Sequence, residues 1–346
     1  MEAKKVAVIG SNGFIGKNLV QKLLDYGYEV SQINRETKND ELLVLIKDCS
    51  VIYYVAGINR PTRNVEYDSH LMDVLSFCQT YTLLENKPNL VYASSIQSGN
   101  GTPYGSNKAT VESIFMEYID HKKLRIERLY NVYGKLCKPN YNSVVSTFIC
   151  NTISGKENVI ENNRKLELIH IDDAIDVIMS GCLQRVSEVS VAHLDTMIKL
   201  IHSGDLELDS YLKKKLHSTY CSYLDNTPVT VEKFEDERGI FSTLYKNSDE
   251  SMISVNVVNA GQRKGNHYHH TKVEEFTVLD GELIIHLVHV ITGAEKRILL
   301  KPFNKVIISP LWNHTIINNT DKKALFLIWT NELYDPQNSD TWQKNK

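Results

Sequence analysis

Two kinds of hydrophobic pattern follow one another along the chain. From residue 4 to about 135, short apolar runs alternate with longer segments whose apolar side chains recur at about 3.6 residues, the helical period. The apolar runs lie at 5–10, 28–33, 50–57 and 89–95. Such alternation is typical of a parallel sheet with helices packed on it, and near-continuous apolar runs fit strands that are covered on both faces. The first part is therefore predicted to be α/β, with a doubly wound parallel sheet.

After residue 230 the pattern changes to strand-like pieces separated by short turns. These pieces lie at 233–245, 252–259, 274–290, 296–300 and 324–330. Asp280 and Gly281 divide the third piece, and Asp-Gly between apolar runs predicts a β-hairpin. Helical patterning ends within 223–232, which contains polar residues and a proline. We predict an α/β domain over 1–228 and a small all-β barrel or sandwich over 229–346; a length of 346 residues also favours two domains.

Composition and charge exclude several classes of protein. A formal net charge of -3 and a pI near 6.5 give no global attraction for nucleic acid or anionic membranes. The start, MEAKKVAVIG, has too short an apolar run for a signal peptide, and no uncharged apolar run approaches the ~20 residues of a membrane span. The six cysteines are scattered without a CxxC motif, which suits reduced thiols. We expect a cytoplasmic protein that binds small molecules and its own copies, and neither nucleic acid nor membrane.

A glycine-rich turn, GxxGxxG at residues 10–16, links the first strand to the first helix. Glycine lets the backbone approach a pyrophosphate, and a helix N-terminus supplies unpaired N–H groups, so the turn predicts a Rossmann-type NAD(P) site. Where an NAD site places an acid, Asn34 and Arg35 stand instead, with Glu36 adjacent. Arginine can accept the extra phosphate of NADP, so we expect NADPH in preference to NADH. The residues expected at the cofactor are Gly10, Asn12, Gly13, Phe14, Ile15, Gly16, Arg35, Ala56 and Gly57.

Four Tyr-x3-Lys pairs occur in the chain, and one has a distinctive context. Tyr104 follows soon after a strand that ends in two serines, and it heads a helical stretch behind a proline. The i, i+4 spacing places Tyr104 and Lys108 on one helix face. Lys108 can then lower a tyrosine pKa that is ordinarily about 10, and such a tyrosine can exchange a proton with a carbonyl oxygen during hydride transfer.

GSNGFIG, VYASS, PYGSNK and RLYNVYG together resemble the extended short-chain dehydrogenase/reductase family, whose members mostly act on nucleotide sugars. The resemblance implies that Ser95 hydrogen-bonds the substrate carbonyl, that Tyr104 is the general acid and that Lys108 holds the nicotinamide ribose. The loop between Ser95 and Tyr104 is shorter than in many relatives, so Ser94 remains an alternative to Ser95. The residues expected at the substrate are Arg60, Asn131, Asn140 and Asn142.

Histidines are concentrated in GNHYHHTKVEE, residues 265–275. His267 and His269 share strand parity and should point to one face, whereas His270 should point away. The segment resembles the first cupin motif, and Pro310, His314 and Asn318 match the second motif loosely, since Trp312 replaces its usual glycine. The resemblance implies a jelly-roll-like cupin barrel with a divalent metal, for which Zn²⁺ is the first choice and manganese, iron or nickel are alternatives. The implied ligands are His267, His269, Glu274 and His314; a metal-free barrel is the other possibility.

AGINRP, CKPNYNSV, STYCSYL, GNHYHHTK and NELYDP, in this order, resemble a family of bifunctional capsular-polysaccharide enzymes that join this reductase type to this cupin type. The resemblance implies a homodimer acting on a UDP-4-keto-6-deoxy-N-acetylhexosamine, UDP-2-acetamido-2,6-dideoxy-hexos-4-ulose. The cupin would invert C3 and the reductase would then reduce C4 with NADPH. The product would be of the UDP-2-acetamido-2,6-dideoxy-L-talose type, on the UDP-N-acetyl-L-fucosamine route to capsule or O-antigen.

The chemistry of a 4-keto sugar explains why two unlike sites would share one chain. A C4 ketone makes the C3 proton removable, because the charge left on carbon is delocalised onto oxygen, and a metal can stabilise that charge. Reduction removes this acidity, so epimerisation must come first. Lys272, His270 and His289 are candidates for the C3 base. Two alternative functions remain: a simple 4-ketoreductase whose barrel only dimerises the chain, and a non-enzymatic NADP-sensing regulator.

Overall fold

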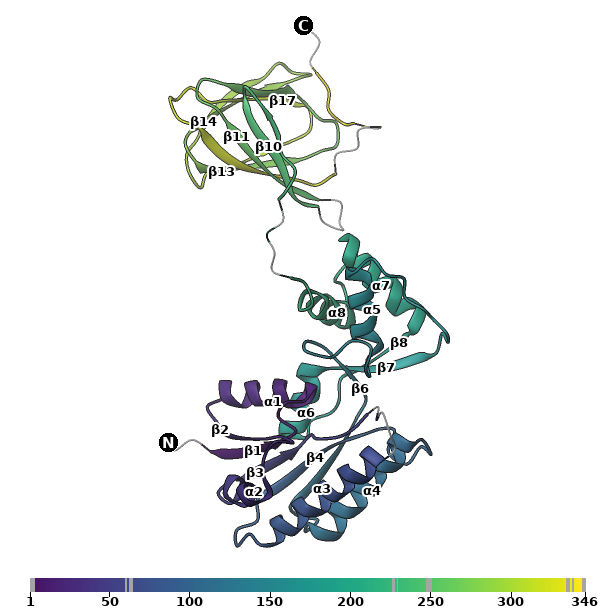
Figure 1. Cartoon of the computed structure of the whole chain (residues 1–346). Coiled ribbons are helices and arrows are strands. Elements are labelled where there is room, and N and C mark those ends of the chain that lie inside the picture. Colours follow the sequence, from purple (N-terminus) through teal and green to yellow (C-terminus); the bar gives the residue numbers. More distant parts are fainter. Residues whose placement is uncertain are drawn as a thin grey trace. The chain divides into compact units, whose positions relative to one another are not determined.

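The computed structural model describes residues 4–59, 61, 65–225, 228, 230–246, 251–333, 337 and 339–343. The chain divides into two compact units (Figure 1). Unit 1 consists of 1–203 and 208–224, and unit 2 of 204–207 and 225–346. The division thus falls after Leu224, where the sequence analysis placed a boundary after residue 228.

Unit 1 is built on a five-stranded parallel sheet in the order β2-β1-β3-β4-β5. The strands are β1 (Lys5–Ile9), β2 (Glu29–Ile33), β3 (Val51–Tyr54), β4 (Asn89–Ser95) and β5 (Leu124–Leu129). Chain order reverses between β1 and β3, and open parallel sheets bind ligands beyond the carboxyl ends of the strands at such a switch point. The doubly wound architecture predicted from the sequence is confirmed.

Helices cover both faces of this sheet (Figure 1). One face carries α1 (Phe14–Asp25) and α6 (Ile171–Ser180), and the other carries α2 (Asn39–Ile46), α3 (Val65–Thr82) and α4 (Pro103–Tyr118). In β1, Val6 and Val8 point into the core under α1 and α6, while Ala7 and Ile9 point into the opposite core. Burial on both faces explains why the strands read as continuous apolar runs.

The rest of unit 1 forms a smaller lobe around a three-stranded sheet in the order β6-β7-β8. Its strands are β6 (Asn131–Tyr133), β7 (Lys165–His170) and β8 (Val186–Ser190), and its helices are α5 (Val144–Ile153), α7 (Val191–Ser203) and α8 (Tyr211–Cys221). Helix α7 packs on both α5 and α8. This lobe places a second set of side chains opposite the carboxyl ends of the parallel strands.

The sequence analysis predicted neither a membrane span nor a disulfide framework. None of the described helices combines the length and apolar character that crossing a membrane requires. All six cysteines carry free thiols, as their scattered positions predicted.

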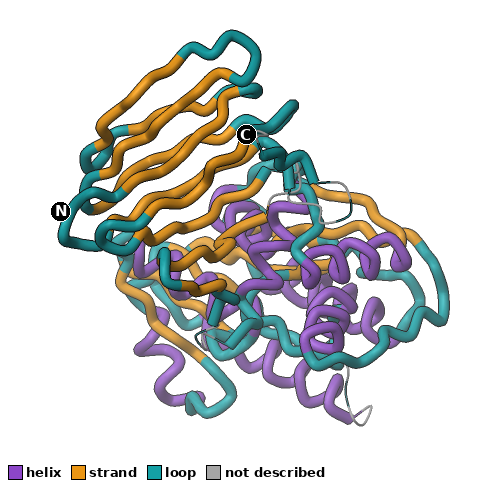
Figure 2. Tube along the Cα trace, turned by 90° about the horizontal axis from the view of Figure 1, so that it is seen from above, coloured by secondary structure: helices purple, strands orange, loops and turns teal. Residues whose placement is uncertain are grey.

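Unit 2 consists of two antiparallel sheets packed face to face around one apolar core. The larger sheet has the order β16-β13-β18-β11-β10-β9, and the smaller one has the order β12-β17-β14-β15. Strands run side by side with loops at their ends (Figure 2). The strands are β9 (Phe234–Asp236), β10 (Gly239–Lys246), β11 (Met252–Val258), β12 (Arg263–His267), β13 (Glu274–Asp280), β14 (Leu283–His289), β15 (Glu295–Leu300), β16 (Lys305–Ile308), β17 (Trp312–Ile317) and β18 (Ala324–Thr330).

The hairpin predicted at Asp280 and Gly281 is wrong. Strand β13 pairs with β16 and β18, whereas β14 pairs with β15 and β17 in the other sheet. Gly281 does adopt a positive φ of 79°, and a Cβ there would lie 2.9 Å from the Cα of Ala324. The turn is therefore tight, but it carries the chain across the core, because β13 and β14 bury alternate side chains from opposite sheets.

Candidate active sites

The turn after β1 brings its backbone close to two other segments. Gly10 has a φ of 91°, and a Cβ there would lie 2.7 Å from the backbone nitrogen of Ala56. A Cβ on Gly16 would lie 2.0 Å from the carbonyl oxygen of Gly10. Helix α1 begins after Gly13 without a side-chain cap, so the N–H groups of its first turn stay available to a ligand. This is the geometry of a phosphate-binding turn.

A cavity of about 1230 Å³ in unit 1 lies at the carboxyl ends of the parallel strands. Ligand pockets usually measure about 300–1,000 Å³, so there is room for more than one small molecule. The predicted cofactor residues that line it are Asn12, Gly13, Phe14, Ile15 and Gly57. Gly10, Gly16 and Ala56 shape the turn from behind. Arg35 is not among the lining residues, and Arg60 lies outside the described residues.

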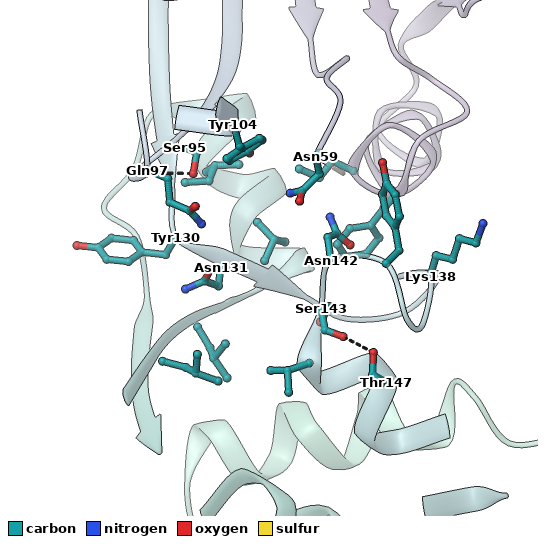
Figure 3. Close-up of a pocket in the computed structure, with 18 of the residues that line it drawn as sticks. Asn59, Ser95, Gln97, Tyr104, Tyr130, Asn131, Lys138, Asn142, Ser143 and Thr147 are labelled. Carbon is teal, nitrogen blue, oxygen red and sulfur yellow. Dashed lines mark hydrogen bonds between the residues drawn. The ribbon is translucent and has the colours of Figure 1, made fainter. Parts of the chain in front are cut away.

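Helix α4 contributes Tyr104 and Lys108 to the lining of this cavity, and Figure 3 shows Tyr104 beside Ser95 there. Thr102 caps the helix by accepting a hydrogen bond from the N–H of Gly105 at 3.1 Å, and Pro103 is its first residue. Lys108 Nζ donates to the Ala93 carbonyl at 3.0 Å and lies 6.0 Å from the ring centre of Tyr104. A Cβ on Gly57 would come within 3.3 Å of that nitrogen, so glycine leaves space for the ammonium group there.

Burial dominates the electrostatics of this pair. It raises the pKa of Tyr104, and the Ser95 hydroxyl opposes the rise only in part. Burial also lowers the pKa of Lys108 to about 8, against the opposing charge of Glu112. The predicted lowering of the Tyr104 pKa is not found: the pKa is raised, and the Lys108 ammonium group lies against the Ala93 carbonyl, 6.0 Å from the Tyr104 ring centre.

The two serines at the end of β4 have different surroundings. Ser94 donates to the Glu112 carboxylate at 2.5 Å, and that carboxylate also binds Arg128 at 2.6 Å. Ser95 accepts a hydrogen bond from the N–H of Gln97 at 3.2 Å and lies beside Tyr104 at the cavity (Figure 3). The hydroxyl of Ser94 is thus used inside a buried network, which leaves Ser95 as the serine next to the tyrosine.

The smaller lobe supplies the other wall of the cavity (Figure 3). All three predicted substrate residues that the structure describes, Asn131, Asn140 and Asn142, line this wall. The sequence analysis missed several further lining residues, namely Asn59, Gln97, Tyr130, Lys138, Ser143, Thr147 and Arg164. Lys138 could have been predicted, because it lies in the same segment, CKPNYNSV, as Asn140. No sequence motif surrounds Arg164 that would have pointed to it.

A buried polar pair behind Lys108 was also missed. His70 Nδ1 lies 3.2 Å from Asn107 Oδ1, while His70 Nε2 and Asn107 Nδ2 are buried without a hydrogen-bond partner among the described residues. Burial lowers the pKa of His70 to about 4, and the charge of Lys108 acts in the same direction. A neutral imidazole at this place has no signature in the sequence.

In unit 2 the four predicted ligands come together. The ligand atoms of His267, His269, Glu274 and His314 all lie within 4.8 Å of one another. His314 Nε2 lies 3.1 Å from Glu274 Oε2, and His269 Nε2 lies 3.6 Å from the same oxygen. Asn266, at a φ of 69°, sits in a bulge of β12 that sets His267 opposite His314 in β17.

The residues of this cluster fit a divalent metal. His269 Nε2 and Glu274 Oε2 face each other in the cluster and are buried without a hydrogen-bond partner among the described residues, which is costly unless something else binds them. Burial lowers the pKa of His267 to about 4 and also lowers that of His314, so both imidazoles are neutral and offer lone pairs. Burial would raise the pKa of Glu274, but the neighbouring histidines hold it below its usual range. Neutral imidazoles with a carboxylate are a donor set for zinc and similar ions.

The three candidate bases near the cluster are placed differently. His289 Nδ1 accepts from the N–H groups of Ile291 and Thr292, so this histidine holds a turn. His270 is exposed, with its ring 5.4 Å from that of Trp342. Lys272 is buried near His269. Burial and the charge of Lys272 act to lower the pKa of His269, but Glu274 and the Asp340 carbonyl outweigh them and raise it.

Residues 6–188 match the model of the NAD dependent epimerase/dehydratase family. The chain belongs to this family. Residues 234–342 match the polysaccharide biosynthesis C-terminal domain. The chain is 32% identical to UDP-2-acetamido-2,6-beta-L-arabino-hexul-4-ose reductase of Pseudomonas aeruginosa, over 98% of each chain.

Similarity to a solved structure extends over nearly the whole chain. The chain is similar to the capsular polysaccharide assembling protein CapF of Staphylococcus aureus, with 28% identity and a TM-score of 0.86 over 99% of this chain and 100% of that one. UDP-N-acetylglucosamine 4-epimerase of Bacillus cereus shares only the fold, with 17% identity and a TM-score of 0.55 over 65% of this chain and 99% of that one. The resemblance to capsular-polysaccharide enzymes with both domains is confirmed.

Proposed function

We propose that the protein is a bifunctional nucleotide-sugar enzyme. Unit 2 epimerises C3 of UDP-2-acetamido-2,6-dideoxy-hexos-4-ulose, and unit 1 then reduces the C4 ketone with NADPH to a UDP-2-acetamido-2,6-dideoxy-L-talose-type product. The observation that carries the proposal is the presence of two complete side-chain sets, Ser95 with Tyr104 and Lys108 in one unit and the buried histidine–glutamate cluster in the other. The hexul-4-ose reductase among its relatives supports the same substrate class.

In unit 1, each group has a distinct task. NADPH, when bound, supplies the hydride. The Ser95 hydroxyl binds the C4 carbonyl oxygen, and Tyr104 donates the proton to it as the alcohol forms. The raised pKa of Tyr104 keeps its phenol protonated at neutral pH, which suits a proton donor. Lys108 holds the nicotinamide ribose, and the first turn of α1 receives the pyrophosphate.

The smaller lobe provides groups suited to the UDP part of the substrate. Lys138 and Arg164 add two cationic side chains to the cavity wall, and cations bind diphosphate oxygens through charge-assisted hydrogen bonds. The amides of Asn140 and Asn142 lie on the same wall and can donate to and accept from a base or sugar.

In unit 2, His267, His269, Glu274 and His314 would hold a divalent metal, which supplies a Lewis acid for a carbonyl oxygen. Lys272, which is buried two residues before Glu274, is proposed to move the C3 proton; His270 is exposed, and His289 Nδ1 accepts hydrogen bonds within a turn.

The test is to incubate purified protein with candidate UDP-4-keto sugars and NADPH and to read the stereochemistry of the product by NMR. Inverted C3 and a reduced C4 are expected. A product reduced at C4 with C3 unchanged would leave a simple 4-ketoreductase, and no turnover of any such sugar would favour a non-enzymatic NADP sensor.

Arg35 is proposed to select NADPH. It follows β2, whose last residue, Ile33, accepts hydrogen bonds from the N–H groups of Gly10 and Ser11 at 2.8 and 3.2 Å, so its loop borders the glycine turn. Arg35→Ala should raise the KM for NADPH by about tenfold or more, the usual loss with a charged hydrogen bond, and should change the KM for NADH little. Steady-state kinetics with both cofactors measure this, with Lys47→Ala, at the exposed residue that follows α2, as the control. Equal use of both cofactors by the unmodified protein would contradict the assignment.

The homodimer stays a prediction, and the outer face of the larger sheet of unit 2 offers a surface for it. Ile307, Trp329 and Tyr245 are exposed there at 54, 36 and 65%, and strand register aligns them with Glu275 and Ile253 in one row. An exposed apolar row of this kind is typical of an interface. Trp329→Glu should shift the protein from dimer to monomer in light scattering; a monomeric unmodified protein would refute the proposal.

A further inference from the structure

The segment Ser339–Gln343, here called the strap, runs along the loop that joins β12 to β13. Tyr268 in that loop and Trp342 in the strap exchange two backbone hydrogen bonds, each 2.9 Å long. The ring of Trp342 also lies 5.4 Å from that of His270. The strap therefore runs beside the loop that carries His269. That loop also links His269 to His267 on one side and to Glu274 on the other.

The carboxylate of Asp340 binds successive backbone groups of this loop. It accepts from the N–H of His270 at 2.9 Å, from that of Thr271 at 2.9 Å and from that of Lys272 at 3.0 Å. It also accepts from the Thr271 hydroxyl at 3.0 Å and from the Trp342 indole at 3.1 Å. Every one of these partners is a donor, so both oxygens of the Asp340 side chain act as acceptors.

The backbone carbonyl of Asp340 binds His269 itself. His269 Nδ1 donates to it, so the ring proton is on Nδ1 and the lone pair of Nε2 faces Glu274. A metal-binding histidine usually has its second ring nitrogen fixed in this way by a carbonyl or carboxylate. One residue thus sets both the tautomer of His269 and the course of the loop around it.

The loop needs such support because of where it lies. Strand β12 belongs to the smaller sheet and β13 to the larger one, so the residues between them cross from sheet to sheet. In the part of the chain that the structure describes, the N–H groups of His270, Thr271 and Lys272 pair with no neighbouring strand, and Asp340 accepts from all three. The Asp340 carboxylate supplies the acceptors that a strand would otherwise provide.

We infer that Asp340 is a positioning residue of the histidine–glutamate cluster, which orients His269 and fixes the loop between β12 and β13 for metal binding. This inference rests on the proposed metal-binding role of unit 2. Asp340→Asn is the sharpest change, because it keeps the size of the side chain and turns an NH₂ group toward backbone N–H donors.

The experiment measures zinc affinity of the full-length protein by competition with a chromophoric chelator. Asp340→Asn should bind zinc about 10- to 100-fold more weakly, the usual range for a group that orients a ligand. The matched control is Asp236→Asn, because Asp236 also accepts a backbone N–H, that of Arg238 at 2.9 Å, but in a turn at β9 outside the cluster. Hydrogen–deuterium exchange of the metal-free proteins should show faster exchange at 268–272 in Asp340→Asn and unchanged exchange in β14 and β17.

Should Asp340→Asn fail to fold, Thr271→Val removes a single donor to Asp340 and is expected to weaken zinc binding about threefold, as half of an ordinary hydrogen-bond energy would. Suppose that the unmodified protein binds zinc and that the Asp340 and Thr271 variants bind it with the same affinity. The positioning role of Asp340 would then be wrong, while the metal-binding role of unit 2 would stand. If the unmodified protein binds no zinc, the metal-binding role falls and the positioning role falls with it.

Discussion

Tyr104→Phe should reduce NADPH oxidation with a UDP-4-keto sugar by about 10²- to 10⁴-fold, the usual loss when a general acid is removed. The phenylalanine keeps the ring that α4 places at the cavity and removes only the proton that the C4 oxygen must receive. Stopped-flow or steady-state absorbance of NADPH measures the effect, and circular dichroism verifies that the fold is intact.

The matched control for this change lies on the same helix. Tyr118 ends α4, is partly exposed, and also belongs to a Tyr-x3-Lys pair, but it does not line the cavity. Tyr118→Phe should leave the rate unchanged within about twofold, since surface substitutions usually have small effects. A fall of less than tenfold in Tyr104→Phe would show that another group donates the proton.

His267→Ala or Glu274→Ala should abolish exchange of the C3 hydrogen of a UDP-4-keto sugar with solvent deuterium. The exchange needs the ketone and the stabilisation that the cluster provides, but no hydride, so it is measured in D₂O without NADPH by NMR or mass spectrometry. Both residues contribute ligand atoms to the cluster, and losing one ligand removes most of the affinity for a metal.

Two variants serve as controls for the exchange experiment. His286→Ala removes a histidine of the same barrel that pairs with Glu295 at 2.6 Å on the outer side of β14, and it should retain exchange. Tyr104→Phe should also retain exchange while losing reduction. Exchange that survives both ligand substitutions would make unit 2 a structural domain and the protein a simple reductase.

The sequence was informative where a pattern is local. Alternation of apolar runs with helical segments predicted the parallel sheet of unit 1. Strand parity placed His267 and His269 on one face, and the resemblance to the cupin motifs predicted that Glu274 and His314 would join them. The hairpin at Asp280 and Gly281 failed, because periodicity shows which face of a strand is buried and not which strand lies beside it. Both β13 and β14 bury alternate side chains, yet they do so from different sheets.

Contacts between distant parts of the chain left no signal. Asp340 binds the loop around His270 across about seventy residues, and nothing near Asp340 in the sequence marks it as a partner. Likewise His70 meets Asn107 only because α3 packs against α4, and Arg164 reaches the cavity from the smaller lobe. Such residues can be found only once the fold has brought the elements together.

The pairing of β11 with β18 determines how unit 2 can be assembled during synthesis. Met252 pairs with Thr330 and Val258 with Ala324, so the centre of the larger sheet cannot close until the ribosome has delivered β18. Until then β11 can pair with β10 along one edge only, and its other edge has no partner strand. Pairings so distant along the chain carry a large entropy of loop closure and form slowly. The five strands of the parallel sheet in unit 1 are complete by Leu129, and α6, which covers one of its faces, ends at Ser180. The core of unit 1 can therefore form while the strands of the barrel are still unpaired.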